Sequence, residues 1–323
     1  MDFDRCINQR GETLPYILVY VLHLSLHIHM HLKEIGKMNY YQDNNNIIID
    51  KVRHFSLKHI FDCGQCFRFN LTDEGNYEGV VFGRVLRTSQ QGDRVTIYDM
   101  SLNEFEERYT SFFALDEDYE HYKEILNTDE IISHAIEVGS GIRILKQDLF
   151  ETIISFIISQ NNNIPRIKKN IEALSKQFGK KLEYGSEIRY AFPTAEKLHQ
   201  ADIEDYSELK LGYRQEYIAN CANDIVSGKL NLTELSLADT ETARKMLLSV
   251  KGIGGKVADC ILLFGLNRYE VCPHDVWVKR IFQTRYNLEK VSEKTGYDFA
   301  SAKWGNYMGI AQQYLFYSER ENL

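Results

Sequence analysis

The 323-residue chain is expected to adopt an α+β fold, with a small antiparallel β-sheet N-terminal domain packed on a two-part all-α body. Three observations predict this class. Between residues 45 and 100, apolar and polar side chains alternate between Gly, Asn and Asp turns, which is the period of half-buried strands. From residue 101 almost to the end, apolar side chains recur at helical spacing. No internal repeat or low-complexity linker separates compact halves.

The sheet region is expected to contain strands at Ile47–Val52, Cys66–Leu71, Tyr77–Leu86 and Arg94–Tyr98. Ser101 and Glu104 then have the spacing of a capping box, in which side chains satisfy the first amides of a helix, so a helix is expected to run to about Phe113.

Further helices are expected along the rest of the chain, each marked by an apolar stripe. They are Tyr119–Leu126, Asp129–Val138, Gln147–Ser159, Arg166–Phe178, Ala195–Gln200, Gln215–Ser227, Thr240–Leu248, Lys256–Leu266, Val276–Tyr286 and Phe299–Phe316. We place the sheet domain at 38–127 and the helical domains at 128–323.

Residues 1–37 differ from the rest, because Pro15–Leu32 is an apolar run interrupted by four histidines. The run has about the minimum length of a membrane span, so an anchor, a signal peptide and an upstream extension from an early start codon all compete. No small-residue cleavage site follows it, which disfavours a signal peptide, and four histidines suit a lipid core poorly. Since Met38 comes just before the expected strands, we favour a non-native extension over an anchor.

Charge and cysteines restrict the class of protein. The chain has 38 basic and 46 acidic residues, a net charge of −8, which argues against a nucleic-acid partner until the distribution is considered. Residues 165–181 carry six basic side chains and one acidic one, and this local net charge of +5 is compatible with DNA binding.

Six cysteines show no paired framework, so reduced thiols in an intracellular protein are expected. Cys63 and Cys66 lack the further ligands of a zinc site, so no metal and no cofactor is expected.

The most informative segment is Val250–Gly255, a glycine hairpin between two expected helices. Gly252 and Gly254 permit positive φ angles, and the unpaired amides of a helix start can hold a DNA phosphate without reading sequence. Lys256 follows in the first turn, where the helix dipole favours a neutral amine over an ammonium. Cys260 lies four residues on, on the same helix face.

This segment resembles the helix-hairpin-helix, Gly/Pro-Asp motif of base-excision DNA glycosylases, and specifically the bifunctional 8-oxoguanine DNA glycosylase/lyases. The resemblance covers about residues 45–320 and implies an active-site cleft between the two parts of the helical body. Besides the hairpin and Cys272-Pro273-His274-Asp275, it rests on four further segments in the family's order, namely Cys63–Phe69, Ser159–Arg166, Leu211–Arg214, and Gly309–Gln312 with Phe316. No four-cysteine cluster loop of iron–sulfur relatives follows the lysine helix.

The resemblance implies a catalytic pair. Lys256 is the nucleophile for the sugar carbon and Asp275 supplies the negative charge for a bond that breaks with cationic character. Asp275 also precedes a helix and suits an N-cap, and the two roles are compatible. An amine nucleophile leaves a Schiff base, which permits β-elimination, so a lyase is expected as well as a glycosylase.

The resemblance also implies a base pocket, because the target base must leave the duplex. Gly64 offers a carbonyl to the N7–H of 8-oxoguanine, Gln312 meets the pairing edge, and Cys260 and Phe316 sandwich the ring. Phe316 alone would equally suit core packing. The resemblance also implies contacts with DNA. Asn161 fills the gap that the flipped base leaves in the duplex, and Arg166 and Arg214 contact the cytosine that has lost its partner. Gly252 and Gly254 contact a phosphate, and Trp277 lies at the phosphate beside the flipped nucleotide.

One departure lies at Trp277, where eukaryotic members usually have a histidine that contacts the phosphate beside the flipped nucleotide. His274 has no assigned role. The implied partner is damaged double-stranded DNA, bound by a monomer without an obligatory protein partner, in the cytoplasm and nucleoid or in a nucleus. Two alternatives stay open: a monofunctional glycosylase for alkylated bases, which would lack the lysine nucleophile, and a non-catalytic helix-hairpin-helix DNA-binding module.

Overall fold

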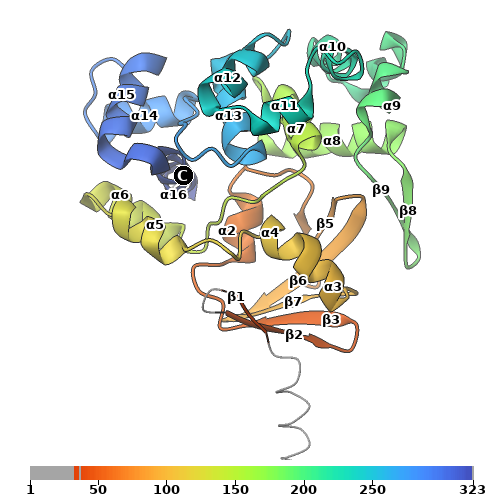
Figure 1. Ribbon diagram of the computed structural model, residues 1–323, viewed down its shortest axis with the longest axis horizontal. Coiled ribbons are helices and arrows are strands. Elements are labelled where there is room, and N and C mark those ends of the chain that lie inside the picture. The colour runs from red at the N-terminus through yellow and green to blue at the C-terminus, as the bar shows by residue number, and fades with distance from the viewer. Residues whose placement is uncertain (1–32, 36–37, 322–323) are drawn as a thin grey trace, which may run out of the picture.

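The computed structural model describes residues 33–35 and 38–321 and has the expected α+β architecture, with a sheet domain below a helical body (Figure 1). The antiparallel sheet has the order β1-β2-β3-β7-β6-β5-β4. Its strands are β1 (Lys33–Ile35), β2 (Met38–Asp43), β3 (Asn46–Asp50), β4 (Asn70–Leu71), β5 (Tyr77–Val81), β6 (Arg84–Gln91) and β7 (Arg94–Ile97). β1 lies within residues 1–37 and pairs with β2, Lys33 opposite Tyr40.

Three details of this domain differ from the expected pattern. Tyr77–Leu86 is two strands, because Phe82 (φ 51°) and Gly83 (φ 73°) form a left-handed turn between β5 and β6. Most of Cys66–Leu71 is irregular, since Phe67 packs into the helical core while Phe69 packs into the sheet core. A short helix α2 (Leu57–Asp62), capped by Ser56, was not expected.

The helix expected from Ser101 forms as α3 (Leu102–Glu104), a π-helical segment η1 (Phe105–Tyr109) and α4 (Thr110–Phe112). The Ser101 hydroxyl accepts from the Glu104 amide at 3.3 Å, as a helix cap should. The Glu104 carboxylate instead pairs with Arg84 on β6, so this helix is tied to the sheet.

The helical body has two parts, and the chain passes from the first to the second and back (Figure 1). The first comprises α5 (Tyr119–Leu126), α6 (Glu130–Val138), α14 (Val276–Thr284), α15 (Glu293–Trp304), η3 (Gly305–Tyr307) and α16 (Met308–Glu321). The second comprises α7 (Leu149–Ser159), α8 (Ile164–Phe178), α9 (Ala195–His199), η2 (Ile203–Leu209), α10 (Arg214–Val226), α11 (Leu232–Leu237), α12 (Thr240–Leu248) and α13 (Gly255–Gly265).

Two predictions for the helical body were wrong. Phe299–Phe316 is not one helix, because the chain breaks at Gly305, whose φ of 54° and ψ of −131° suit glycine. The second difference is a hairpin of β8 (Lys181–Tyr184) and β9 (Glu187–Tyr190) between α8 and α9. Its strands alternate polar and apolar residues around the turn at Gly185, but each has only four residues and none of them is buried, so the pattern is short.

Each domain has its own apolar core. The sheet core gathers most of the buried side chains between Met38 and Leu115, with Leu145 added, and the helical core gathers most of those from Leu126 onward, with Cys63 and Phe67 added. Among the residues that the structure describes, no helix is long and apolar enough to cross a membrane. The apolar run Pro15–Leu32 and the first 32 positions of the proposed extension lie outside the described residues.

Candidate active site

A cleft of about 1000 Å³ opens between the two helical parts and is closed on one side by the turn that follows α2. It collects residues that are far apart in the sequence. Ten of the twelve site residues predicted from the sequence line it: Gly64, Asn161, Arg166, Gly254, Lys256, Cys260, Asp275, Trp277, Gln312 and Phe316. Arg214 and Gly252 do not line it, although both contact the loop and hairpin at its rim.

The glycine hairpin between α12 and α13 has two different glycines. Gly252 has φ of 96°, and a Cβ atom there would lie 2.3 Å from Cγ of Tyr217, so no other residue fits without displacement. Gly254 has extended backbone (φ −94°, ψ 177°), is exposed, and meets nothing within 4 Å of a Cβ position. Gly254 therefore keeps the helix start accessible, whereas Gly252 shapes the hairpin.

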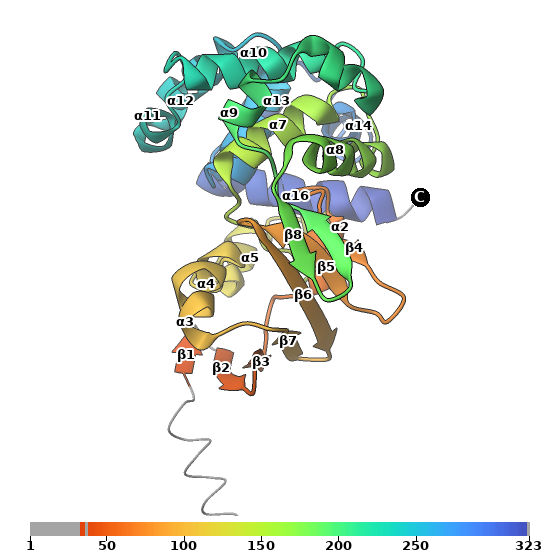
Figure 2. The same ribbon diagram turned by 90° about the vertical axis from the view of Figure 1, so that its right-hand side faces the viewer.

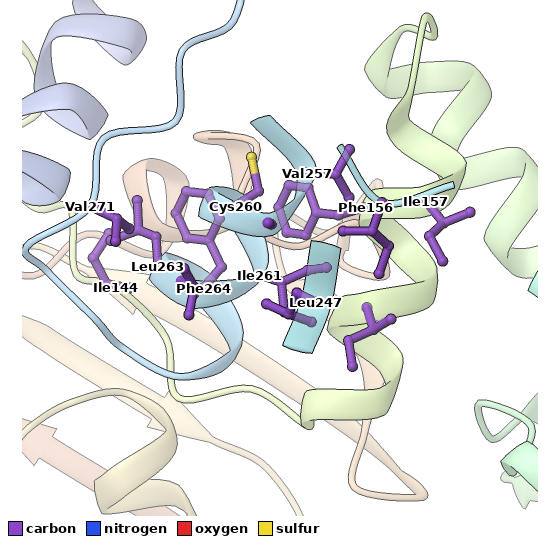
Figure 3. Packing of buried hydrophobic residues seen from close by; sticks show 14 of the residues in the cluster. Ile144, Phe156, Ile157, Leu247, Val257, Cys260, Ile261, Leu263, Phe264 and Val271 are labelled. Atoms are coloured by element: carbon purple, nitrogen blue, oxygen red, sulfur yellow. The ribbon is translucent and has the colours of Figure 1, made fainter. Parts of the chain in front are cut away.

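Lys256 lies in the first turn of α13, over the aromatic ring of Phe156. Its Nζ is 5.8 Å from the centre of the Phe156 ring, which stacks on Phe264 with centroids 5.3 Å apart. Figure 3 shows Phe156, Phe264 and Cys260 packed around α13, with the Cys260 sulfur directed away from Ile261 and Leu263. The amine therefore lies over an apolar ring inside the cleft.

Cys260 is buried one turn after Lys256. Burial raises the pKa of its thiol to about 11, while the nearby Lys256 ammonium lowers it and Asp275 raises it. The thiol is thus held in its neutral form between the two groups of the expected catalytic pair. A neutral sulfur can pack against a base without adding charge.

Asp275 is the N-cap of α14. Its Oδ1 accepts from the amides of Trp277 at 3.0 Å and Val278 at 2.9 Å, which fixes the direction of the carboxylate. Trp277 contacts Phe316 edge to face, with ring centroids 6.5 Å apart. The cap and the cleft position are therefore compatible for one carboxylate.

The residues expected in the base pocket lie in the cleft where α16 faces the turn after α2. Gly64 has φ of 82°, and a Cβ atom there would lie 3.4 Å from the Phe316 ring. Gln312 is buried, and its Oε1 has no hydrogen-bond partner among residues 33–35 and 38–321. A buried amide oxygen without a partner is costly, which is consistent with a group that awaits a ligand.

The loop between α7 and α8 forms the opposite wall. Asn161 has φ of 47° and is exposed at the cleft, where it is accessible to a ligand. Asn163 caps α8 by accepting from the Arg166 amide at 3.0 Å. The Arg166 side chain is exposed, with Nη2 3.5 Å from the Lys210 carbonyl.

Arg214 differs from Arg166 because it is only 5% exposed. Its guanidinium donates to the carbonyls of Gln160, Leu211 and Asn161, the last at 2.9 Å. Gln160, which the sequence analysis did not single out, also donates to the Gly252 carbonyl at 2.9 Å. Arg214 and Gln160 therefore join the Asn161 loop to the hairpin.

Sequence reasoning also missed Gln313 and Arg320, which line the cleft from α16. Their spacing relative to Phe316 (three residues before and four after) is a helical spacing that could have indicated one face. In the described part of the chain, no group of three or more His, Cys, Asp or Glu side chains could hold a metal ion.

Two family models of known proteins match most of the chain. A family model for the 8-oxoguanine DNA glycosylase N-terminal domain matches residues 47–153, and the HhH-GPD superfamily model for base-excision DNA repair proteins matches residues 154–305.

The structure of MBOgg1 with a low-affinity DNA ligand is 40% identical, covers 89% of this chain and 99% of that one, and superposes with a TM-score of 0.86. The 8-oxoguanine glycosylase/lyase of Clostridium acetobutylicum, in complex with double-stranded DNA containing cytosine opposite 8-oxoguanine, is also 40% identical, with coverage of 90% and 99% and a TM-score of 0.85. The N-glycosylase/DNA lyase of Saccharomyces cerevisiae is 36% identical over 214 residues, which are 55% of this chain and 57% of the yeast protein. The chain therefore spans little more than half the length of that relative.

Proposed function

The chain belongs to the 8-oxoguanine DNA glycosylase family, and from this we propose that it removes 8-oxoguanine from double-stranded DNA and then cleaves the strand at the abasic site. The observation that carries the proposal is the cleft itself. Lys256 at the start of α13 and Asp275 at the start of α14 line the same cleft as Gly64 and Phe316. A nucleophile, a fixed carboxylate and a base pocket are the groups that the reaction needs.

In the first step, the Lys256 amine attacks C1′ of the damaged nucleotide as the bond from C1′ to the base breaks. The base leaves with the bonding electrons and takes a proton. Asp275, held by the two α14 amides, stabilises the positive charge that develops on the sugar.

In the second step, the bond from C1′ to the ring oxygen O4′ breaks, O4′ takes a proton released from the nitrogen, and the nitrogen forms a protonated Schiff base with C1′. Removal of a proton from C2′ then expels the 3′ phosphate by β-elimination, and water releases the sugar fragment from Lys256.

Recognition requires the base to leave the stack, which costs a few kcal/mol in a duplex. The proposal places Asn161 in the gap, since it is exposed at the tip of its loop with a left-handed backbone. Arg166 reads the estranged cytosine through its exposed guanidinium, and Arg214 contributes by holding the carbonyl of Asn161. The proposal assigns the phosphate backbone to Gly252, Gly254 and Trp277. The unpaired amides at the start of a helix are suited to binding a phosphate.

In the pocket, the Gly64 carbonyl accepts the N7–H that only the oxidised purine carries, and Gln312 meets the pairing edge. Ordinary guanine has no hydrogen at N7, so one hydrogen bond discriminates between the two. Cys260 and Phe316 enclose the ring. The protein acts as a monomer on damaged DNA without an obligatory protein partner, in whichever compartment holds the DNA.

Borohydride trapping tests the proposal on a duplex with one 8-oxoguanine opposite cytosine. The wild-type protein should form a covalent adduct and a nicked strand, and Lys256→Gln should form neither yet still bind the duplex. Lys251→Gln is the matched control, because Lys251 is an exposed lysine of the same hairpin that pairs only loosely with Glu216, at 3.8 Å. It should trap as well as the wild type.

The outcomes separate the alternatives. Release of an alkylated base without an adduct or a nick would identify a monofunctional glycosylase. Binding of lesion DNA without release of any base would identify a non-catalytic module. An adduct that persists in Lys256→Gln but disappears in Lys251→Gln would move the nucleophile to Lys251.

A further inference from the structure

In the turn that contains Gly64, the backbone carbonyls on both sides of the glycine accept hydrogen bonds from side chains. The Asp62 carbonyl accepts from Nη2 of Arg320, and the Cys63 carbonyl accepts from Nε2 of Gln313 at 2.6 Å. On the other side of Gly64, the Gln65 carbonyl accepts from Nε2 of Gln147 at 2.9 Å. Over residues 33–35 and 38–321, no donor reaches the Gly64 carbonyl. The contacts thus fix the neighbours of Gly64 and leave one acceptor free.

Two of these three donors come from one face of α16. Gln313 and Arg320 are seven residues apart, about two helical turns, and Phe316 lies between them. Figure 2 shows α16 crossing the junction of the two domains beside α2. One helix face therefore carries both the ring that would cover a bound base and the groups that hold the turn opposite it.

Arg320 has further contacts that connect these elements. Its guanidinium lies 5.6 Å from the centre of the Phe316 ring and 5.5 Å from that of Tyr317. Nη2 is 3.6 Å from the Glu321 carboxylate, which is also 3.6 Å from Nζ of Lys58 on α2. The end of α16 thus contacts both ends of α2, the helix that leads into the Gly64 turn.

Packing alone does not require a guanidinium here. Nη1 of Arg320 is buried and has no partner in the described part of the chain, and an unpaired buried donor is unfavourable. A leucine or methionine would support Phe316 without that cost. Gln313 is only 2% exposed, and its amide is likewise a polar group placed in an apolar interior.

We propose that Gln313 and Arg320 are positioning residues that hold the Gly64 carbonyl and the Phe316 ring at the separation that a flipped 8-oxoguanine needs. This inference rests on the proposed function. Both residues act through Gly64 and Phe316. Removing either one lets the turn move, and a displacement of about 1 Å in such a site costs on the order of 100-fold in rate.

Two reactions of one active site provide the test. Base excision needs the pocket, whereas cleavage of a duplex with a preformed abasic site needs Lys256 but no base. Single-turnover rates of both are measured for Arg320→Met and Gln313→Leu, which remove the donors at similar volume. We expect base excision to fall roughly 10- to 100-fold and abasic-site cleavage to stay within about twofold of wild type.

Arg285→Met is the matched control, because Arg285 also pairs with α16, at Glu319, but is half exposed and lies outside the cleft lining. Both of its rates should equal those of wild type. Arg320→Lys can restore the bond to Asp62 but not the guanidinium that lies over the Phe316 ring, so its excision rate should lie between those of wild type and Arg320→Met.

Equal losses in both reactions, or none in either, would overturn the inference. If Arg320→Met melts well below Arg285→Met, Arg320→Lys and Gln313→Leu decide by the same comparison of the two rates. If the wild type itself releases no 8-oxoguanine, the proposed function fails instead.

Discussion

Replacing Gly252 with alanine should destabilise the hairpin that the proposed function assigns to a DNA phosphate. The backbone φ of 96° is outside the range that side chains favour, which costs about 1–2 kcal/mol by analogy with left-handed backbone. The new Cβ would also lie 2.3 Å from Cγ and 2.7 Å from Cβ of Tyr217, and such overpacking costs about 1–3 kcal/mol. Together these give about 2–5 kcal/mol.

At about 2–4 °C per kcal/mol for chains of 150–250 residues, the apparent Tm should fall by roughly 4–20 °C. Affinity for an 8-oxoguanine duplex should fall too, because the amides at the start of α13 depend on the hairpin. Thermal melting and a binding titration at one fixed salt concentration measure the two effects.

Gly254→Ala is the matched control. Its backbone suits alanine and its Cβ site is open, so the only stability loss is an N-cap effect of about 1 kcal/mol. Its methyl group would still project where a phosphate must approach, so binding should weaken while Tm barely changes. Equal melting temperatures for the two variants would refute the steric reasoning, and unchanged binding by both would remove the hairpin from the DNA interface.

Three further outcomes are expected. A chain that starts at Met38 should excise 8-oxoguanine as fast as the full chain, because every proposed site residue follows it; a slower rate would show that the leading segment contributes. Arg166→Ala should raise relative excision opposite adenine, with about 1–3 kcal/mol of discrimination lost by analogy with duplex base contacts, and unchanged single-turnover ratios across four opposing bases would assign Arg166 to phosphate. Burial, and then Arg143, lower the pKa of Lys123 to about 8 from its usual 10.5, so between these values the unfolded chain keeps a proton that the folded chain has lost. Stability relative to Lys123→Met should therefore rise from pH 8 to pH 10 in denaturant titrations, and a flat difference would contradict this.

Local patterns predicted most helices because the apolar stripe of each helix lies within one short segment. Most N-caps were not used: Asp148 caps α7 by accepting from the Glu151 amide, although that helix was expected to start at Gln147. The strand boundaries were less accurate. The turn at Phe82 could not be anticipated, since a phenylalanine with positive φ has no sequence signature.

The candidate site was predicted where it depends on short motifs and missed where it depends on long-range contacts. Lys256 and Cys260 share a helix, so their proximity follows from spacing alone. Gln313 donates to a carbonyl 250 residues earlier, which no local pattern encodes. Arg214 illustrates a third case: its place in a motif was recognised, but not that its guanidinium is used by backbone carbonyls of the Asn161 loop.

His274 shows how such long-range packing reaches the proposed chemistry. Gly296 is buried inside α15, where glycine costs about 0.5–1 kcal/mol relative to alanine. A Cβ there would lie 2.2 Å from Nε2 of His274, so the glycine is required by the imidazole rather than by the helix. Burial lowers the pKa of His274, which favours the neutral ring in this contact. Asp275 is thus fixed on one side by the α14 amides that it caps and on the other by a neighbour locked against α15.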